Sequence, residues 1–199
     1  WGGSAIGVNK ATDVNIQDSR FDSNVARSNG AVIFDLCSDV VFNACNFTNN
    51  NVTKSAGAVY FANIREGKDK SVSFENCVFI NNIAELDAGA IYSGSKGAYI
   101  ASSNFTKNSA RNGAAIVLMD TSDVFKCNFE NNTASGNGTI WVNGIQSTTD
   151  IENSRFIGNK AYNGAGVYHA VTTIGAPRLF ISWSDFINNT ASHNGGANR

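Results

Sequence analysis

Residues 105–118 read FTKNSARNGAAIVL, and this stretch contains both halves of a motif that decides the fold. The first half is a Phe, followed three positions later by an Asn and two positions after that by an Ala. The second half is a run of small residues that ends in a branched aliphatic residue. Gly and Asn are poor helix formers but tolerate a positive φ. The stretch therefore predicts short strands joined by tight turns.

Both halves of this motif recur along the whole chain. The first half occurs as Phe21/Asn24, Phe47/Asn50, Phe79/Asn82, Phe105/Asn108, Phe129/Asn132, Phe156/Asn159 and Phe186/Asn189. The second half occurs as Ser4-Ala5-Ile6, Gly30-Ala31-Val32, Gly57-Ala58-Val59, Gly89-Ala90-Ile91, Ala114-Ala115-Ile116, Gly138-Thr139-Ile140 and Ala165-Gly166-Val167. A compound motif with this many copies is an internal repeat, and internal repeats decide the architecture.

The spacing of the repeat indicates its geometry. Each Phe precedes the next branched residue by 11 or 12 positions, whereas the return to the next Phe takes 13 to 20. One turn of each unit is therefore constant and the other absorbs insertions. Alternating apolar residues flank both turns, and no unit contains a helical pattern. We predict an all-β, right-handed parallel β-helix (solenoid) of about seven coils. Residues 1–199 are expected to form a single solenoid segment of a longer repeat protein.

Stacking of equivalent positions explains why these residue types recur. Phe on Phe fills a core, and Asn on Asn shares amide hydrogen bonds along the axis, as in other cross-β stacks. The Asn amides could instead bind Ca²⁺, but turn geometry is the favoured interpretation. Two residues before each Phe the side chain is always small, which predicts a crowded interior position. These residues are Ser19, Cys45, Cys77, Ser103, Cys127, Ser154 and Ser184.

The repeat resembles that of a known family. The Phe-x-x-Asn unit alternates with the tetrapeptides Gly3-Ser4-Ala5-Ile6, Ala88-Gly89-Ala90-Ile91 and Gly113-Ala114-Ala115-Ile116. This alternation resembles the repeat of chlamydial polymorphic outer membrane proteins and of adhesin-like surface proteins of methanogenic archaea, although strict Gly-Gly-Ala-Ile is not kept. The resemblance covers essentially the whole chain. It implies a parallel β-helix on the cell surface or outer membrane, exposed outside the cell and associated with adhesion.

The net charge of the chain and the residues at its two termini indicate which classes of partner to expect. The net charge is −1, from 15 Lys and Arg against 16 Asp and Glu, and no basic run exceeds two residues. A nucleic-acid partner is therefore not expected, because phosphate binding needs concentrated positive charge. We expect a protein or a glycan on another cell surface, or in an extracellular assembly. Neither end shows a polar cap, so end-to-end self-association is also predicted.

The cysteines and histidines do not form a recognisable site. Metal-site spacing is absent from the four cysteines, Cys37, Cys45, Cys77 and Cys127. Free core thiols are favoured, and a disulfide between Cys45 and Cys77 is the alternative. We expect His169 to be a hydrogen-bonded core or rim residue. No cofactor and no metal are predicted.

The acidic residues do not converge in the sequence, and we therefore predict no enzyme. Asp18 and Asp185 are expected to share one register in distant coils. The predicted function is a structural or adhesive module of a secreted cell-surface protein. The alternative is a carbohydrate-active β-helix enzyme, a polysaccharide lyase or glycosidase, with its site partly outside this segment. Such enzymes need several carboxylates on one face, so three or more acids in one groove would favour this alternative.

Two sets of surface residues are candidates for binding and for modification. The outward positions of the strand after the small residues are Gly7, Ile33, Tyr60, Tyr92, Val117, Trp141 and Tyr168. Their aromatic members Tyr60, Tyr92, Trp141 and Tyr168 form a hypothetical docking stripe for a glycan or protein. The favoured interpretation is that other residues or chains cover the stripe, or that stacking stabilises the sheet. N-glycosylation sequons occur at Asn46, Asn51, Asn104, Asn131, Asn137 and Asn188.

Overall fold

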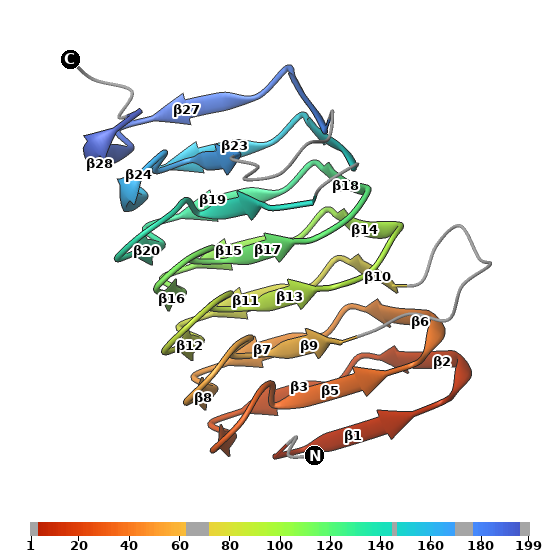
Figure 1. Cartoon of the computed structure of the whole chain (residues 1–199). Coiled ribbons are helices and arrows are strands. Elements are labelled where there is room, and N and C mark those ends of the chain that lie inside the picture. The colour runs from red at the N-terminus through yellow and green to blue at the C-terminus, as the bar shows by residue number, and fades with distance from the viewer. Residues whose placement is uncertain (1–3, 63–71, 145–146, 170–176, 196–199) are drawn as a thin grey trace.

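The computed structural model describes residues 4–62, 72–144, 147–169 and 177–195. Within these ranges the chain forms 28 strands and no helix, arranged in four parallel sheets of seven strands each (Figure 1). Each coil contributes one strand to every sheet, so six full turns separate the first strand of a sheet from its last. The predicted all-β parallel solenoid is confirmed, and its right-handed winding stays a prediction.

The four sheets are named A to D in the order in which the chain visits them. Sheet A contains β1 (Ile6–Asn9), β5 (Val32–Asp35), β9 (Val59–Phe61), β13 (Ile91–Ser93), β17 (Ile116–Leu118), β21 (Ile140–Val142) and β25 (Val167–His169). Sheet B contains β2 (Thr12–Gln17), β6 (Ser38–Asn43), β10 (Val72–Glu75), β14 (Ala98–Ala101), β18 (Ser122–Phe125), β22 (Thr148–Glu152) and β26 (Arg178–Ser182). Sheet C contains β3 (Arg20–Asp22), β7 (Asn46–Thr48), β11 (Val78–Ile80), β15 (Asn104–Thr106), β19 (Asn128–Glu130), β23 (Arg155–Ile157) and β27 (Asp185–Ile187). Sheet D contains β4 (Val25–Ala26), β8 (Asn51–Val52), β12 (Ile83–Ala84), β16 (Ser109–Ala110), β20 (Thr133–Ala134), β24 (Lys160–Asn163) and β28 (Thr190–Asn194).

The alternating patterns predict two strands per unit, and these are the strands of sheets A and B. The structure has two more strands per unit, which form sheets C and D. The repeat Phe lies in the middle of each sheet C strand, and the Ala after the Asn ends up in sheet D. Most sheet D strands are only two residues long. A segment this short has no periodicity of its own, because alternation needs at least four residues to be visible.

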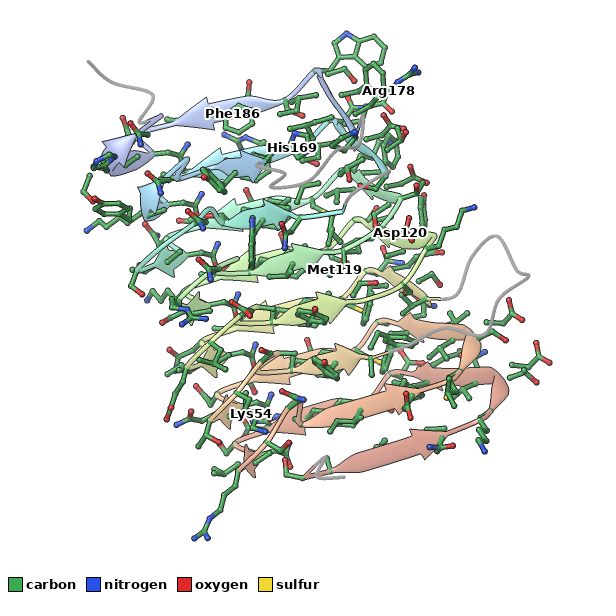
Figure 2. The ribbon with its side chains drawn as sticks, in the orientation of Figure 1. Lys54, Met119, Asp120, His169, Arg178 and Phe186 are labelled. Carbon is green, nitrogen blue, oxygen red and sulfur yellow. The ribbon has the colours of Figure 1, made fainter. Side chains whose placement is uncertain are left out.

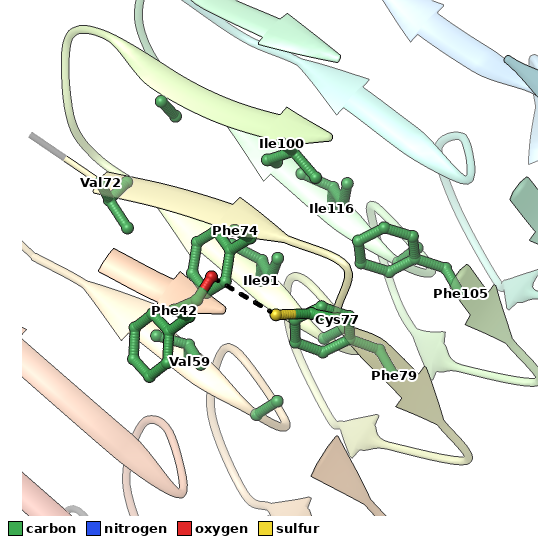
Figure 3. Close-up of a cluster of buried hydrophobic side chains, with 14 of the residues drawn as sticks. Phe42, Val59, Val72, Phe74, Cys77, Phe79, Ile91, Ile100, Phe105 and Ile116 are labelled. Atoms are coloured by element: carbon green, nitrogen blue, oxygen red, sulfur yellow. Dashed lines mark hydrogen bonds between the residues drawn. The ribbon is translucent and has the colours of Figure 1, made fainter. Parts of the chain in front are cut away.

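The core is organised as columns of identical side chains that run along the solenoid axis. The repeat Phe rings from Phe21 to Phe186 stack face to face, with centroids 4.6 to 4.9 Å apart. Phe42 and Phe74 of sheet B form a second stack, which meets the first edge-on (Figure 3). The single internal Phe column is confirmed. Stacked rings in successive coils bury each other's faces, and burial of apolar area is the main stabilising contribution.

Three corners of every coil are made by a single residue with positive φ. The corner between sheets B and C has Asp18, Ala44, Asn76, Ser102, Lys126, Asn153 and Trp183. The corner between sheets C and D has Ser23, Asn49, Asn81, Lys107, Asn131, Gly158 and Asn188. The corner between sheets D and A has Gly30, Ala56, Ala88, Gly113, Gly138, Gly164 and Gly195. Gly and Asn adopt this left-handed conformation readily, which explains their abundance in the sequence. The segment of constant length runs from sheet C through sheet D to sheet A. The segment of variable length contains the connection between sheets A and B, where the insertions fall.

The Asn of each Phe-x-x-Asn unit forms a continuous hydrogen-bonded ladder inside the solenoid. Asn82, for example, donates from Nδ2 to Oδ1 of Asn108 (3.0 Å) and to the carbonyl oxygen of Phe47 (2.9 Å). Its own Oδ1 accepts from Nδ2 and from the backbone N–H of Asn50. Every donor and acceptor of this buried amide is therefore used. The predicted ladder is confirmed, and each amide oxygen from Asn50 to Asn189 accepts two hydrogen bonds.

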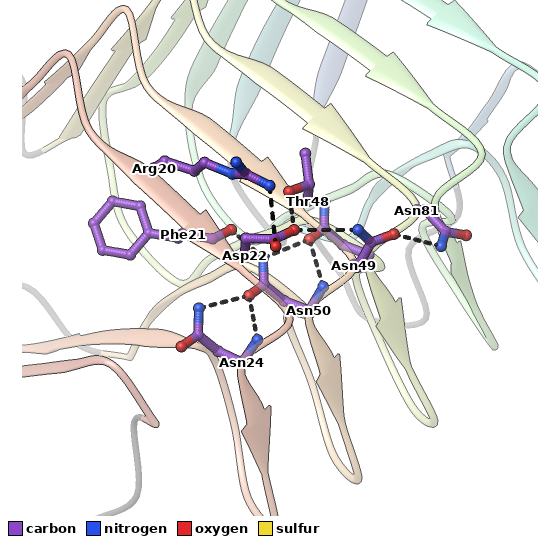
Figure 4. A network of polar contacts seen from close by, with 9 residues as sticks. Arg20, Phe21, Asp22, Asn24, Thr48, Asn49, Asn50 and Asn81 are labelled. Carbon is purple, nitrogen blue, oxygen red and sulfur yellow. Dashed lines mark hydrogen bonds and ion pairs between the residues drawn. The ribbon is translucent and has the colours of Figure 1, made fainter.

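Two further polar ladders follow the corners and were not predicted. At the corner between sheets D and A, Asn163 donates to Asn137 (3.0 Å) and Asn112 donates to Asp87 (2.9 Å). At the corner between sheets C and D, Asp22 accepts hydrogen bonds from Thr48 and Asn49 and pairs with Arg20 (Figure 4). The hydrogen bonds from Thr48 and Asn49, together with the charge of Arg20, hold the pKa of the Asp22 carboxyl below its usual range.

Candidate binding surfaces

The predicted aromatic stripe has the predicted register. Gly7, Ile33 and Tyr60 are paired in successive strands of sheet A, and the pairing continues through Tyr92, Val117 and Trp141 to Tyr168. The rings of Tyr60 and Tyr92 stack with their centroids 4.9 Å apart. These side chains therefore lie in one line along the outward face of sheet A.

The stripe is only partly open to solvent, because the chain's own corner between sheets D and A covers its base. Ile33 and Val117 are buried, whereas Tyr60, Tyr92, Trp141 and Tyr168 are half-buried. Ala56, Ala88 and Val117 form a small apolar cluster against which Tyr60 and Tyr92 pack. Burial raises the pKa of the Tyr60 hydroxyl, and it raises that of Tyr92 to about 12. Docking on this stripe stays a prediction.

The six sequons differ in their accessibility. Asn46, Asn51, Asn104, Asn131 and Asn188 are exposed on sheets C and D or on the corner between them. Asn137 is different, because its Oδ1 accepts a hydrogen bond from Asn163 within the corner ladder. The sequon's Thr139 is fully buried and donates to the carbonyl oxygen of Ala165. Exposed sequons therefore gather on one side of the solenoid, away from sheet B.

All four cysteines are free and buried, as favoured from the sequence. Cys77 lies among the aromatic rings of the core, where its thiol donates to the Phe42 carbonyl oxygen, 3.6 Å away (Figure 3). Burial raises the pKa of the Cys77 and Cys127 thiols to about 12. A thiol that stays protonated is neither a nucleophile nor a metal ligand.

The histidines contribute no acid–base site among the described residues. His169 points inward at the end of β25, in register with the buried Val142 (Figure 2). Its Nε2 is buried and has no hydrogen-bond partner among the described residues, so the hydrogen bond expected for this histidine stays a prediction. His193 stacks on Tyr162, with the ring centroids 4.7 Å apart.

The expectation that no acids converge is wrong on the outward face of sheet B. Asp123 and Asp150 are direct neighbours in β18 and β22, and Glu152 follows two residues later on the same face. These three carboxylates line a groove of about 400 Å³ together with Tyr99, Phe125 and Phe180. We name this feature the sheet B groove. The described ranges contain no group of three or more His, Cys, Asp or Glu side chains arranged to hold a metal ion.

The sequence does contain the signal for the sheet B groove. Asp123 and Asp150 each lie six residues before their repeat Phe, as Tyr99 and Phe180 do in their own coils. Side chains at equal offsets from the Phe column must stack when the coils stack. The expected pair of Asp18 and Asp185, by contrast, is wrong. Asp18 occupies a corner between sheets B and C, whereas Asp185 lies in β27 and pairs with Arg155.

A comparison with known families agrees with this architecture. Residues 76–94 match the family model of the Chlamydia polymorphic membrane protein repeat. The matched stretch contains one complete copy of the motif, from Phe79 and Asn82 to Gly89-Ala90-Ile91. This chain is a parallel β-helix repeat protein. The resemblance drawn from the motifs is confirmed over these residues of the β-helix.

Other comparisons add no relative to this β-helix. Neither a curated protein nor a solved structure matches it. In the part of the β-helix that the structure describes, no helix is long and apolar enough to cross a membrane.

Proposed function

We propose that this β-helix is a structural and adhesive module of a secreted cell-surface protein and performs no catalysis. The observation that carries the proposal is the uninterrupted Asn ladder, which connects every coil from Asn24 to Asn189. Because the same hydrogen bonds recur between each pair of neighbouring coils, every coil is held in the same position relative to the next. The match to the Chlamydia polymorphic membrane protein repeat supports a role at a cell surface.

The geometry suits a rigid display scaffold. Coils advance by about 4.8 Å each, so the six turns between β1 and β25 span roughly 29 Å. Outward side chains on each sheet are held in straight lines at this spacing. Such lines give a partner a regular surface, while the interior ladders keep the rod from bending. These side chains lie on strands that are already ordered, so binding does not require a partner to order a loop.

Surface exposure is tested with antibodies raised against the folded chain. Intact source cells should be labelled as strongly before permeabilisation as after it, and the purified chain should compete with cells for attachment to their target surface. Labelling that appears only after permeabilisation would contradict the surface assignment. Labelling of intact cells without any competition for attachment would leave a scaffold and remove the adhesive role.

The sheet B groove is the one observation that favours the enzyme alternative. It brings three carboxylates together, and glycoside hydrolysis uses a pair of carboxylates that flank the bond. The assay is release of reducing ends or of unsaturated products from a panel of neutral and acidic polysaccharides. Turnover that is lost in Asp150→Asn would establish the enzyme, and we expect none from the native protein.

A further inference from the structure

The sheet B groove combines exposed aromatic rings with carboxylates on a flat outward face. We propose that it is a docking site for a lysine- or arginine-rich segment of a partner protein. This inference deepens the proposed function, because it names the chemistry of the partner that the adhesive module would recognise. Four observations carry it: the exposed rings, the arrangement of the carboxylates, an internal example of the same contact, and the position of the exposed sequons.

Two aromatic side chains of this face are exposed to solvent, whereas Tyr99 and Phe125 are half-buried. Phe180 is 54% exposed, and Trp183, at the corner directly after β26, is 79% exposed. Phe180 points outward from β26, in register with Asp150 of β22. Exposed apolar patches that are rimmed by polar residues are typical of protein-binding sites. Aromatic residues are also enriched in the centres of protein interfaces.

The carboxylates decide the charge of the partner. Asp150 and Glu152 stand two residues apart on the same outward face of β22, so two negative charges lie close together. No hydrogen bond or ion pair reaches the Asp150 or Glu152 carboxylate from any residue that the structure describes. A cation bound beside Asp150 and Glu152 would relieve the repulsion between these two carboxylates. The groove is therefore complementary to positive charge.

The molecule already contains one example of the contact that we propose. The ammonium group of Lys126 lies 4.9 Å from the ring centroid of Phe125, which lines the groove. This distance is typical of a cation–π interaction. In the last described coil Ser182 and Trp183 occupy the positions of Phe125 and Lys126, so this ring–lysine pair does not recur there. A lysine or arginine from a partner can make the same kind of contact with the exposed ring of Phe180, which is paired with Asp150.

The surroundings of the groove leave it accessible to a protein segment. The exposed sequons lie on sheets C and D and on the corner between them, so glycans attached there would project away from sheet B. A neutral glycan would use the aromatic rings but has no need of three carboxylates, and an acidic glycan would be repelled. Charge complementarity therefore selects a basic protein segment.

The test measures binding of a short fluorescent lysine- and arginine-rich peptide to the folded chain by fluorescence anisotropy. The same peptide with Glu in place of every basic residue is the control ligand. We expect binding of the basic peptide only, with an affinity that falls as salt is added. The double variant Asp150→Asn/Glu152→Gln and the variant Phe180→Ala should each weaken binding roughly tenfold.

A matched variant separates a local site from general charge attraction. Glu85→Gln/Glu130→Gln also removes two negative charges, one directly after β12 and one in β19, and both lie outside the groove. It should bind the basic peptide as the native chain does, and all variants should keep the native melting temperature. Equal weakening by both double variants, or no binding of the basic peptide at all, would overturn the proposal.

Binding of the same variants to a glycan array tests whether the groove binds a glycan and not a basic protein segment. Binding of neutral glycans that is lost in Phe180→Ala but kept in Asp150→Asn/Glu152→Gln would assign the groove to sugars instead. None of these outcomes depends on where the protein resides in the cell. A failed docking site is therefore distinguishable from a failed surface assignment, which the antibody labelling decides.

Discussion

The ring of Phe105 stacks on the ring of Phe79 with their centroids 4.7 Å apart and their planes only 2° apart. Both rings are fully buried, and each continues the stack into the neighbouring coil. A truncation in this column leaves a cavity that neighbouring coils cannot close, because their backbones are held at the strand spacing.

The first prediction follows from that cavity. Phe105→Ala should lower the free energy of unfolding by about 3–5 kcal/mol, as for other buried Phe truncations. The matched variant Phe186→Ala removes a ring that is 38% exposed, so it should have a clearly smaller effect. Urea denaturation of both variants measures the difference. An unchanged midpoint for Phe105→Ala would show that the column is not central to stability.

Removal of one amide from the Asn ladder should also be costly. Asn108→Ala leaves the backbone N–H and Nδ2 of Asn82 without their acceptor and the carbonyl oxygen of Phe79 without its donor. Buried groups that lose their partners cost about 1–3 kcal/mol each, so we expect a loss of roughly 3 kcal/mol or more. The exposed Asn104→Ala should change stability little. Comparable melting temperatures for the two variants would remove the ladder as a source of stability.

The small residues before sheet A are predicted to be a steric requirement. A Cβ added at Gly89 would collide with the carbonyl oxygen of Ala114 and lie 2.7 Å from the backbone nitrogen of Ser109. Because both obstacles are backbone atoms of the next coil, Gly89→Ala should destabilise the protein by about 1–3 kcal/mol. Gly7→Ala meets no atom within 4 Å and serves as the control. Equal stability of the two variants would mean that the coils can shift apart without loss.

The buried thiols should make stability sensitive to alkaline pH. The pKa of Cys77 is raised to about 12 in the folded state, whereas a thiol in an unfolded chain ionises near 8.5. Between roughly pH 8.5 and 12 the unfolded state therefore binds fewer protons, and the free energy of unfolding falls as pH rises. Below this window the contribution of the protonated thiol is fully present.

Cys77→Ser isolates this effect. Ser103 occupies the equivalent position in the next coil, where its hydroxyl donates to the carbonyl oxygen two residues before it, as the Cys77 thiol does. The variant should fold with nearly native stability at neutral pH and lose less stability than the native protein at alkaline pH. Urea titrations at both pH values provide the measurement. Parallel losses in both proteins would assign the alkaline sensitivity to other groups.

The last prediction concerns glycosylation. In protein secreted by a host that attaches N-glycans, folded material should carry glycan at the exposed Asn46, Asn51, Asn104, Asn131 or Asn188 and none at Asn137. Oδ1 of Asn137 accepts a hydrogen bond from Asn163 and its sequon partner Thr139 is buried, so a glycan on Nδ2 would have to fit inside the corner. Peptide mapping of the monomeric fraction measures occupancy. Substantial occupancy at Asn137 in folded protein would contradict the described corner.

The sequence alone was sufficient for the repeat architecture. Phe and Asn recur at a constant offset, and only a stack of coils places equal offsets in contact, so the Phe column and the Asn ladder could be predicted by counting. The stripe from Gly7 to Tyr168 followed from the same counting. Turn chemistry was equally readable, because Gly and Asn mark positions that need a positive φ. These features are local or strictly periodic, and both kinds of information are present in the amino-acid sequence.

Tertiary structure decided what each face exposes. The stripe proved half-buried because the corner between sheets D and A folds back onto Tyr60 and Tyr92, and nothing in the alternation of the strand encodes that contact. Asp123, Asp150 and Phe180 became one groove only once their coils were stacked, since they lie far apart in the sequence. Exposure depends on how non-neighbouring segments cover one another, whereas register depends on the repeat alone. The core of this β-helix was therefore determined by its period, and its surface was decided by the folding of its corners.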